Sequence, residues 1–227
     1  MSNLATPTYY SPPATARYPW LNKPDTKFDT PGRYKVDLMG PVSLGDEPCT
    51  NAKGQQVGGL NDILEPLMAL AREEAQEQFD NMSEARRKKS KAVVEMVPFV
   101  HDVLDEDDEP TGEIFYKVST LAGGTRKSDG RPWSRKLTIV DPAGRPTNRM
   151  VTGGSIIRAA FTAKPYVMAT CAYGVKLYLE AVQVLALGTS NGSASGFGVV
   201  GDPFEDEDDD LLPCDVEHAE ADLDDEF

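Results

Sequence analysis

The carboxyl-terminal segment, residues 201–227, most restricts how this chain can fold. It carries 14 acidic side chains and no lysine or arginine, and the chain ends in Phe227. Like charges repel and few apolar residues are present, so such a segment cannot bury enough surface to fold. We therefore expect a disordered acidic tail over residues 202–227, joined by a flexible linker rich in Gly and Ser over residues 189–201.

The rest of the chain is electrically neutral, but its charge is unevenly distributed. Residues 1–110 carry 12 basic and 19 acidic groups, a net charge of -7, whereas residues 111–200 carry 11 basic and 4 acidic groups, a net charge of +7. A basic segment followed by a polyanionic end predicts a surface for a polyanion and a tethered acidic competitor for that surface. The alternative is a solvated tail that only keeps the protein soluble.

Length and cysteine content limit the class of protein. A chain of 227 residues has room for one ordinary domain and a tail. The sequence has neither a charged and apolar leader at its start nor an apolar run long enough to cross a bilayer. Cys49, Cys171 and Cys214 are odd in number and widely spaced, as is usual in a reducing compartment. We expect a soluble intracellular protein.

The chain offers little material for catalysis. His101 and His218 are its two histidines, and without paired cysteines they predict neither a metal site nor a catalytic triad. The GxGxxG pattern at 196–201 forms the end of the linker, directly before the acidic run, where no strand and helix can hold a dinucleotide. A carboxylate nuclease needs acids fixed on rigid elements, which a tail does not provide. We expect no enzyme and no cofactor.

One amphipathic helix is predicted at residues 60–82. Pro66 is awkward there, because proline is comfortable in the first turn of a helix and costly deeper in. The helix should therefore begin near Glu65 or be kinked in its earlier turn. Its apolar face is expected to comprise Leu67, Leu70, Ala71, Ala75, Phe79 and Met82.

Alternation of apolar and polar residues predicts five strands, at residues 34–38, 114–121, 135–140, 155–163 and 175–187. Asp141-Pro-Ala-Gly144 closes the third with the residues that a type I turn favours. The proline-rich residues 1–31 predict an extended arm, and the like-charged blocks 86–91 and 105–109 predict exposed loops. Five strands, one helix and long loops favour a mainly β domain over residues 32–188, as a small barrel rather than a sandwich.

Strand periodicity also predicts which side chains point inward. Ile114, Tyr116 and Val118 form the inward set of their strand, so Phe115 and Lys117 should point outward. Phe161 is expected in the core, with Arg158 on the opposite side. In the last strand the expected inward face is Val175, Leu177, Leu179 and Ala181, and the expected outward face is Lys176, Tyr178 and Glu180.

Basic residues interleaved with aromatic residues on strands and loops predict binding of single-stranded nucleic acid. Cations follow the phosphates while rings stack on the bases, and such binding tolerates any sequence. Trp133 and Tyr166 are expected in loops beside basic residues. The predicted DNA-binding residues are Lys117, Arg126, Lys127, Arg131, Trp133, Arg135, Lys136, Arg158, Lys164 and Tyr166. An alternative is a protein-binding adaptor or DNA mimic whose working part is the acidic tail.

Several segments in order resemble the single-stranded DNA-binding protein of T-seven-type, short-tailed bacteriophages. They are YPWLNKPD at 18–25, GRYKVDL at 32–38, LTIVD at 137–141, Gly153-Gly154, KPY at 164–166, VKLYLE at 175–180 and the terminal DEF at 225–227. The resemblance implies a five-stranded OB-fold barrel that coats single-stranded DNA in phage replication and recombination, in the host cytoplasm. It also implies a homodimer whose tail docks on the phage DNA polymerase and primase-helicase.

The resemblance carries over to particular positions. Lys117 and Tyr166 match positions associated with DNA contact, and Phe227 matches an aromatic end needed for partner binding. The partner-binding residues are therefore expected to be Asp224, Asp225, Glu226 and Phe227. Two departures bear on the DNA path: Ala160 stands where a relative has lysine, and Pro31 stands where one has arginine, so Arg158 or Arg33 is expected to compensate.

Overall fold

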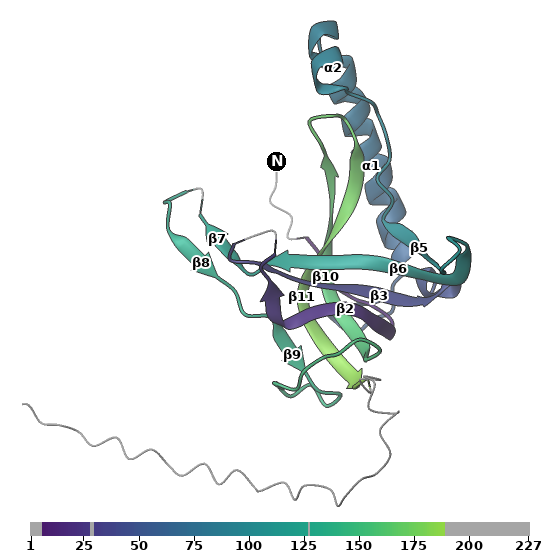
Figure 1. Ribbon diagram of the computed structural model, residues 1–227, viewed down its shortest axis with the longest axis vertical. Coiled ribbons are helices and arrows are strands. Elements are labelled where there is room, and N and C mark those ends of the chain that lie inside the picture. Colours follow the sequence, from purple (N-terminus) through teal and green to yellow (C-terminus); the bar gives the residue numbers. More distant parts are fainter. Residues whose placement is uncertain (1–5, 28–29, 127, 189–227) are drawn as a thin grey trace, which may run out of the picture. The chain divides into compact units, whose positions relative to one another are not determined.

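The computed structural model describes residues 6–27, 30–126 and 128–188 (Figure 1). Lys127 and the predicted linker and acidic tail lie outside the described residues. Strands dominate the regular structure, which confirms the predicted mainly β class. The elements are β1 (Tyr9–Tyr10), β2 (Ala14–Asp25), β3 (Arg33–Pro41), a 3-10 turn (Val42–Gly45), β4 (Thr50–Asn51), α1 (Leu60–Asp80), α2 (Glu84–Ser90), β5 (Val100–Leu104), β6 (Pro110–Leu121), β7 (Gly123–Thr125), β8 (Pro132–Ser134), β9 (Thr138–Val140), β10 (Ile156–Val167) and β11 (Tyr173–Ala186).

The five longest strands pair in a closed circuit. β2 pairs with β3, β3 with β6, β6 with β11, β11 with β10, and β10 with β2. Within this circuit the contact between β6 and β11 is parallel and the others are antiparallel. β5 adds to β6 beyond the end of its contact with β11. β9 adds to the edge of β11 that also carries β6, opposite β10. A closed circuit gives the sheet one enclosed side and one outward side.

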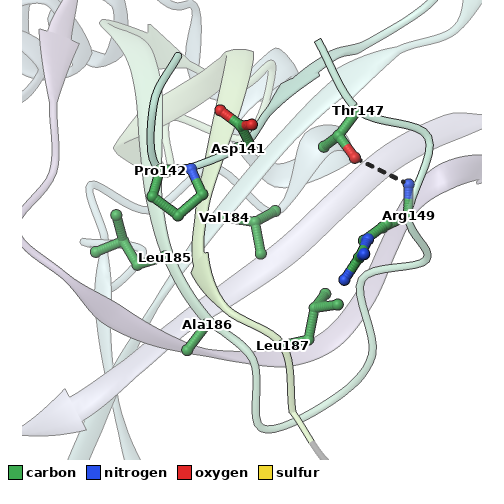
Figure 2. Close-up of a pocket in the computed structure, with 8 residues that line it drawn as sticks. All are labelled: Asp141, Pro142, Thr147, Arg149, Val184, Leu185, Ala186 and Leu187. Atoms are coloured by element: carbon green, nitrogen blue, oxygen red, sulfur yellow. Dashed lines mark hydrogen bonds between the residues drawn. The ribbon is translucent and has the colours of Figure 1, made fainter. Parts of the chain in front are cut away.

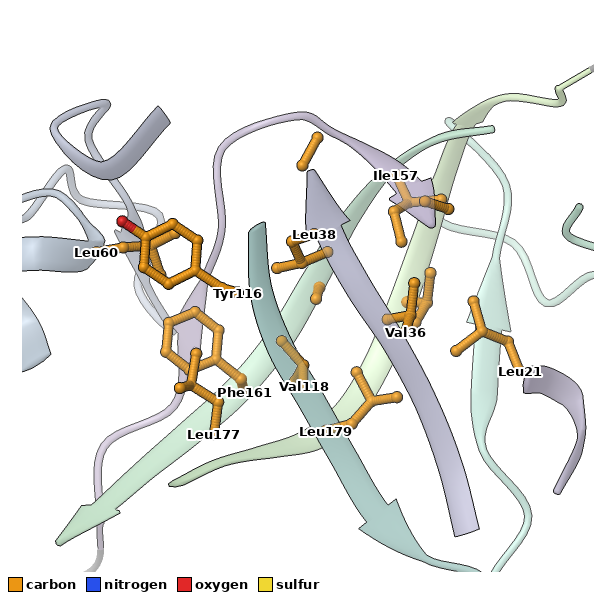
Figure 3. Packing of buried hydrophobic residues seen from close by; sticks show 14 of the residues in the cluster. Leu21, Val36, Leu38, Leu60, Tyr116, Val118, Ile157, Phe161, Leu177 and Leu179 are labelled. Carbon is orange, nitrogen blue, oxygen red and sulfur yellow. The ribbon is translucent and has the colours of Figure 1, made fainter. Parts of the chain in front are cut away.

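One apolar core fills the enclosed side of the circuit (Figure 3). Successive strand residues point to opposite faces, so Leu38, Tyr116 and Phe161 enter the core from three strands and are fully buried. This confirms the inward set predicted for 114–121 and the core position of Phe161. Burial of each such side chain contributes about 1.5–3 kcal/mol relative to exposure.

A bulge changes the expected pattern of β11. The register with β10 shifts between Ala160 and Phe161, because Ala160 faces Ala181 while Phe161 faces Leu179. Glu180 is the extra residue, and beyond it the inward side chains are Val182 and Val184. The predicted inward position of Ala181 is therefore wrong, since a period of two cannot continue through a bulge.

Helix α1 begins at Leu60 and contains Pro66 in its interior, on an exposed position. Its start is stabilised by Asp62, whose carboxylate accepts a hydrogen bond of 2.9 Å from the backbone N–H of Gly59. The helix packs against β10 and β11 (Figure 1). Its buried residues are Leu60, Leu64, Met68, Ala71 and Ala75.

The predicted apolar face of α1 is only partly correct. Ala71 and Ala75 are buried, whereas Leu70 is 56% exposed. The buried stripe of the helix begins before Pro66, and Leu64 and Met68 determine which positions face the strands. Leu70 lies outside this stripe. No helix within the described ranges is both long and apolar enough to cross a membrane.

Three further expectations need correction. The proline-rich start is not only an arm, because β1 and the 12-residue β2 pair with β10 and β3. The basic block at 86–91 lies largely in α2, although the helix is short and has no buried residue. The strand expected at 135–140 covers only Thr138–Val140. The loop at 105–109 and the turn at Asp141–Gly144 are confirmed, the latter by a 3.0 Å hydrogen bond from Gly144 N–H to the Asp141 carbonyl.

Candidate nucleic-acid interface

Charged side chains line up across the outward side of β2, β3 and β6. In the strand register Arg17 pairs with Asp37, and Asp37 pairs with Lys117. Side chains of residues paired in this way stand on the same face of a sheet. Leu177 and Val118 pair inward between β11 and β6, so Lys176 stands on the outward side next to Lys117. Cations from β2, β6 and β11 therefore share one surface.

An aromatic ring organises the middle of this surface. The Phe115 ring has the guanidinium carbon of Arg17 at 4.9 Å from its centroid and the Lys117 ammonium at 5.5 Å. The imidazole of His101, from β5, stacks on the same ring with centroids 5.0 Å apart. Arg17 also lies over the ring of Tyr18, again at 4.9 Å. Cation–π contacts of this kind hold long basic side chains in place at the surface.

A second ring lies between two lysines on β10 and β11. The ammonium groups of Lys164 and Lys176 are 5.9 Å and 5.2 Å from the centroid of Tyr178. Lys164 and Lys176 are directly paired in the register of the two strands. The outward positions of Lys176 and Tyr178 confirm the predicted face of the last strand. We use the term cationic face for Arg17, Phe115, Lys117, Lys164, Lys176 and Tyr178.

A groove of about 470 Å³ opens on the cationic face between β5, β6 and the paired strands β10 and β11. It lies where β5 and β11 meet different parts of β6. Its lining includes Phe99, His101, Lys117, Tyr166 and Lys176. Partial burial raises the pKa of the Tyr166 phenol, so its hydroxyl stays protonated near neutral pH. Rings and cations thus meet in one concave place.

Two titratable groups tune the charge of this surface. Burial raises the pKa of Asp37, although Lys117 and Arg17 oppose the shift. Burial lowers the pKa of His101, and the Lys117 charge lowers it further, against a smaller opposing influence of Asp102. At neutral pH His101 is therefore mostly neutral, and acidification adds positive charge at this position.

Arg126, Arg131 and Trp133 belong to a separate hairpin. β7 and β8 pair with each other beyond the end of β6 and carry Arg126, Arg131 and Trp133 near or in their strands (Figure 1). Arg126 and Arg131 are exposed, and Arg131 lies 4.0 Å from Asp129. Trp133, expected in a loop, lies in β8 and packs over Gly124.

Arg135 has a structural task. Its guanidinium donates one hydrogen bond of 3.3 Å to the Thr120 hydroxyl and forms an ion pair with Glu180. Its backbone N–H donates to the Ala122 carbonyl at 2.7 Å. These contacts tie the base of the hairpin to β6 and β11. The hairpin is therefore positioned by the same arginine that the sequence suggested for DNA.

Lys136 and Arg158 lie apart from the cationic face. Lys136 is exposed in a groove of about 260 Å³ with Leu21 and Asn22. The Arg158 guanidinium donates hydrogen bonds of 2.9 Å and 3.0 Å to the Ser11 carbonyl and the Thr50 hydroxyl. Arg158 thereby anchors β1 and β4 against β10. Tyr166, expected in a loop, lies in β10 and lines the groove.

Sequence reasoning missed several residues of this surface. Arg17 and Tyr18 were not considered because the proline-rich start did not suggest a strand. His101 joins Phe115 only through the pairing of β5 with β6. The signal for Phe115, Lys176 and Tyr178 was present, since strand parity placed all three outward beside basic residues.

A different hollow lies at the far end of β11 (Figure 2). This pocket, of about 460 Å³, is lined by Asp141, Pro142, Thr147, Arg149 and residues 184–187. The Asp141 carboxylate accepts hydrogen bonds from Arg145, chiefly from its backbone N–H, and these lower the pKa of Asp141. It therefore stabilises its own turn. Nowhere in the described ranges do three His, Cys, Asp or Glu side chains gather closely enough to hold a metal ion.

No protein-family model and no curated protein sequence matches the chain. Among solved structures, the single-stranded DNA-binding protein encoded by bacteriophage T7 superposes with a TM-score of 0.59 at 22% identity, covering 88% of this chain and 100% of that chain. A carboxyl-terminally truncated single-stranded DNA-binding protein from bacteriophage Enc34 matches with a TM-score of 0.48 at 11% identity, over 83% and 94% of the two chains. The chain thus has the fold of the T7 protein, which confirms at the level of the fold the resemblance noted in the sequence.

Proposed function

We propose that this chain binds single-stranded DNA without sequence preference and acts in phage DNA replication and recombination. The observation that carries the proposal is the cationic face, on which Arg17, Lys117 and Lys176 from three strands alternate with aromatic rings. Cations can follow the phosphates while rings meet the bases, and such contacts read no sequence. The likeness to the T7 protein supports this choice of ligand.

We further propose that the five-strand circuit is an OB-fold barrel. Its order of pairing, with one parallel contact between the third and the last strand of the circuit, supports this. OB-folds bind oligonucleotides on the face formed by their second and third strands and by the flanking loops. In this chain those strands are β3 and β6. The β7–β8 hairpin, with Arg126 and Arg131, would then border the DNA path.

The acidic tail, residues 202–227, is proposed to compete with DNA for the cationic face. A flexible segment of this length spans about 30 Å, and tethering gives it an effective concentration of about 1 mM. DNA binding would release the tail. Asp224, Asp225, Glu226 and Phe227 would then bind the phage DNA polymerase and primase-helicase, and a homodimer would form in the host cytoplasm.

An alternative function is that of a protein-binding adaptor or DNA mimic without DNA binding of its own. This alternative also relies on the acidic tail, but it assigns no role to the cationic face. Titration of the purified protein with fluorescent oligo(dT) and with a duplex of equal length separates the two. We expect saturable binding to oligo(dT) and much weaker binding to the duplex. An oligo(dT) signal that never saturates would favour the adaptor.

A charge-reversed variant locates the binding surface. Lys117→Glu should weaken oligo(dT) binding strongly, because it places a negative charge in the groove beside Phe115. Lys53→Glu is the matched control. Its exposed side chain belongs to the turn after β4, and the turn is held by its backbone N–H, which donates to Asn51 at 2.9 Å. Equal effects of the two variants would mean that overall charge, and not this face, governs binding.

A further inference from the structure

We infer that Tyr18 is a nucleobase-stacking residue that extends the DNA path from the groove across the sheet to β2. The inference rests on the proposed function and adds a subsite to it. Lys176 on β11 and Arg17 on β2 are separated by β6 and β3, which places them three strand spacings apart, about 14 Å along the sheet. Among the described residues that line the groove none belongs to β2 or β3, so the DNA must continue past β3 to contact Tyr18.

The backbone of Tyr18 is the first observation. Its φ is 50°, in the left-handed region that side chains with a Cβ rarely adopt. The other non-glycine residues with positive φ in the described ranges, Lys91, Asp108 and Cys171, follow a helix or lie in turns. Tyr18 instead lies inside β2, directly before Pro19, which further disfavours this conformation. Such strain costs about 1–3 kcal/mol, persists only where the surrounding structure enforces it, and is concentrated at functional sites.

The strained backbone exposes an aromatic ring. The register of β2 with β3 is interrupted between Arg17 and Trp20, so Tyr18 lies in a bulge. Its side chain is 66% exposed, the largest exposed fraction among the large hydrophobic residues of the described ranges. A bulge in a strand turns a side chain away from the regular faces of the sheet. Here it presents a ring to solvent that packing does not need.

The neighbours of this ring suit a nucleotide. Arg17 lies over Tyr18 at 4.9 Å and bridges it to Phe115 at the same distance. Within the described ranges no residue accepts a hydrogen bond from the Arg17 guanidinium. Its N–H groups can therefore bind a phosphate while its plane supports the ring. Phe115 is already surrounded by Arg17, His101 and Lys117, whereas Tyr18 has one such neighbour and an uncovered ring surface.

The strain itself supplies a sharp test. Glycine adopts positive φ at no steric cost, so Tyr18→Gly removes the ring and relieves the backbone together. We expect the melting temperature of the full-length variant not to fall, while its affinity for long oligo(dT) drops about 5- to 150-fold, the effect of one lost stacked base. Tyr18→Phe, which keeps the ring, should bind like the wild type. Tyr10→Ala removes another exposed tyrosine ring, on β1, and should also leave affinity unchanged.

Oligonucleotide length separates this subsite from the groove. The deficit of Tyr18→Gly should shrink toward zero for the shortest oligo(dT) that the wild type binds. If Tyr18→Gly binds long oligo(dT) as the wild type does, the subsite is overturned and DNA binding by the cationic face is untouched. A wild type that binds no oligo(dT) would instead overturn the proposed function.

Photocrosslinking covers the case in which Tyr18→Gly is unstable. The wild-type chain is irradiated with oligo(dT) that carries 5-iododeoxyuridine, and the crosslinked peptides are identified by mass spectrometry. We expect crosslinks at Tyr18 with long oligonucleotides, and their loss in Tyr18→Gly if it folds. Crosslinks confined to other rings would contradict the inference.

Discussion

The guanidinium of Arg17 lies against the ring of Phe115, although β2 and β6 are separated by β3. The Arg17 side chain therefore reaches across β3, where its partner in the strand register is Asp37. It makes Phe115 the common support of three side chains, since Lys117 and His101 touch the same ring. The arrangement of Arg17, Lys117 and His101 therefore depends on one aromatic side chain.

Replacing Phe115 by leucine tests that dependence. Phe115→Leu keeps apolar bulk, so the free energy of unfolding should change by less than about 1.5 kcal/mol. Loss of the π face removes cation–π contacts worth about 0.5–1 kcal/mol at exposed sites, which predicts an affinity for oligo(dT) about two- to fivefold weaker. Fluorescence anisotropy and urea denaturation measure the two quantities. Unchanged affinity would show that the cations hold their positions without the ring.

Asp37 places a negative charge between Arg17 and Lys117, so Asp37→Asn should tighten DNA binding. Burial raises its pKa, which means that the folded state favours the protonated carboxyl. The ionised form therefore opposes folding above the folded-state pKa, and this penalty disappears as the pH falls below the unfolded value. Asp37→Asn should accordingly be more stable than the wild type at pH 7 and not at pH 3. Thermal melts at both pH values check the stability, and an unfolding curve that does not shift at pH 7 would refute it.

DNA binding should strengthen on acidification. The pKa of His101 lies below its ordinary value of about 6.5, so the imidazole gains its charge only as the pH falls below that value. A bound phosphate would favour the charged form of the imidazole. Affinity for oligo(dT) should therefore rise as the pH is lowered from about 7.5 to about 5.5, the range in which histidine usually titrates. His101→Gln should flatten that part of the profile. A variant with the same pH dependence as the wild type would assign it to other groups, with Asp37 the first to test.

The hydroxyl of Tyr116 ties the core to helix α1. It donates a hydrogen bond of 2.8 Å to the side-chain oxygen of Asn61, and burial raises the pKa of Tyr116 to about 12, so the proton stays in place. Tyr116→Phe should cost about 1 kcal/mol of unfolding free energy. Tyr34→Phe is the control, because the described residues give the Tyr34 hydroxyl no hydrogen-bond partner although its ring is buried. Equal losses in chemical denaturation would mean that the bond to Asn61 contributes nothing.

Removal of residues 202–227 should tighten oligo(dT) binding, most visibly at low salt, where the proposed attraction between the tail and the cationic face would be least screened. The effect should shrink as salt is added. Calorimetry of the full-length and truncated chains with oligo(dT) measures it, and a truncated chain that binds DNA no better would contradict competition by the tail.

Removal of Phe227 alone should weaken binding to the phage DNA polymerase, the proposed partner, and leave DNA affinity nearly intact. Calorimetry of this variant with the polymerase and with oligo(dT) measures the two affinities.

Much of this surface could be predicted locally, because strands β6 and β11 alternate with a period of two. That pattern placed Phe115, Lys117, Lys176 and Tyr178 outward. It failed at Ala181, because the bulge at Glu180 reverses the faces, and at Tyr18, where prolines concealed a paired strand.

Other features depend on partners distant in the sequence. In the sequence nothing distinguishes Arg135 from an exposed basic residue. Its partners Glu180 and Thr120 lie beside it only in the folded chain. Arg158 likewise finds Ser11 and Thr50 only in the folded chain. A local pattern identifies basic residues, whereas the fold decides which of them remain available for a phosphate.

The salt dependence of oligo(dT) affinity tests the central claim most directly. Each phosphate neutralised on a single strand contributes about -0.7 to the slope of log affinity against log salt. Lys117→Ala should weaken binding and reduce the magnitude of the slope by about 0.7, whereas Lys53→Ala should leave both unchanged. Equal slopes for the wild type and Lys117→Ala would contradict DNA binding by the cationic face.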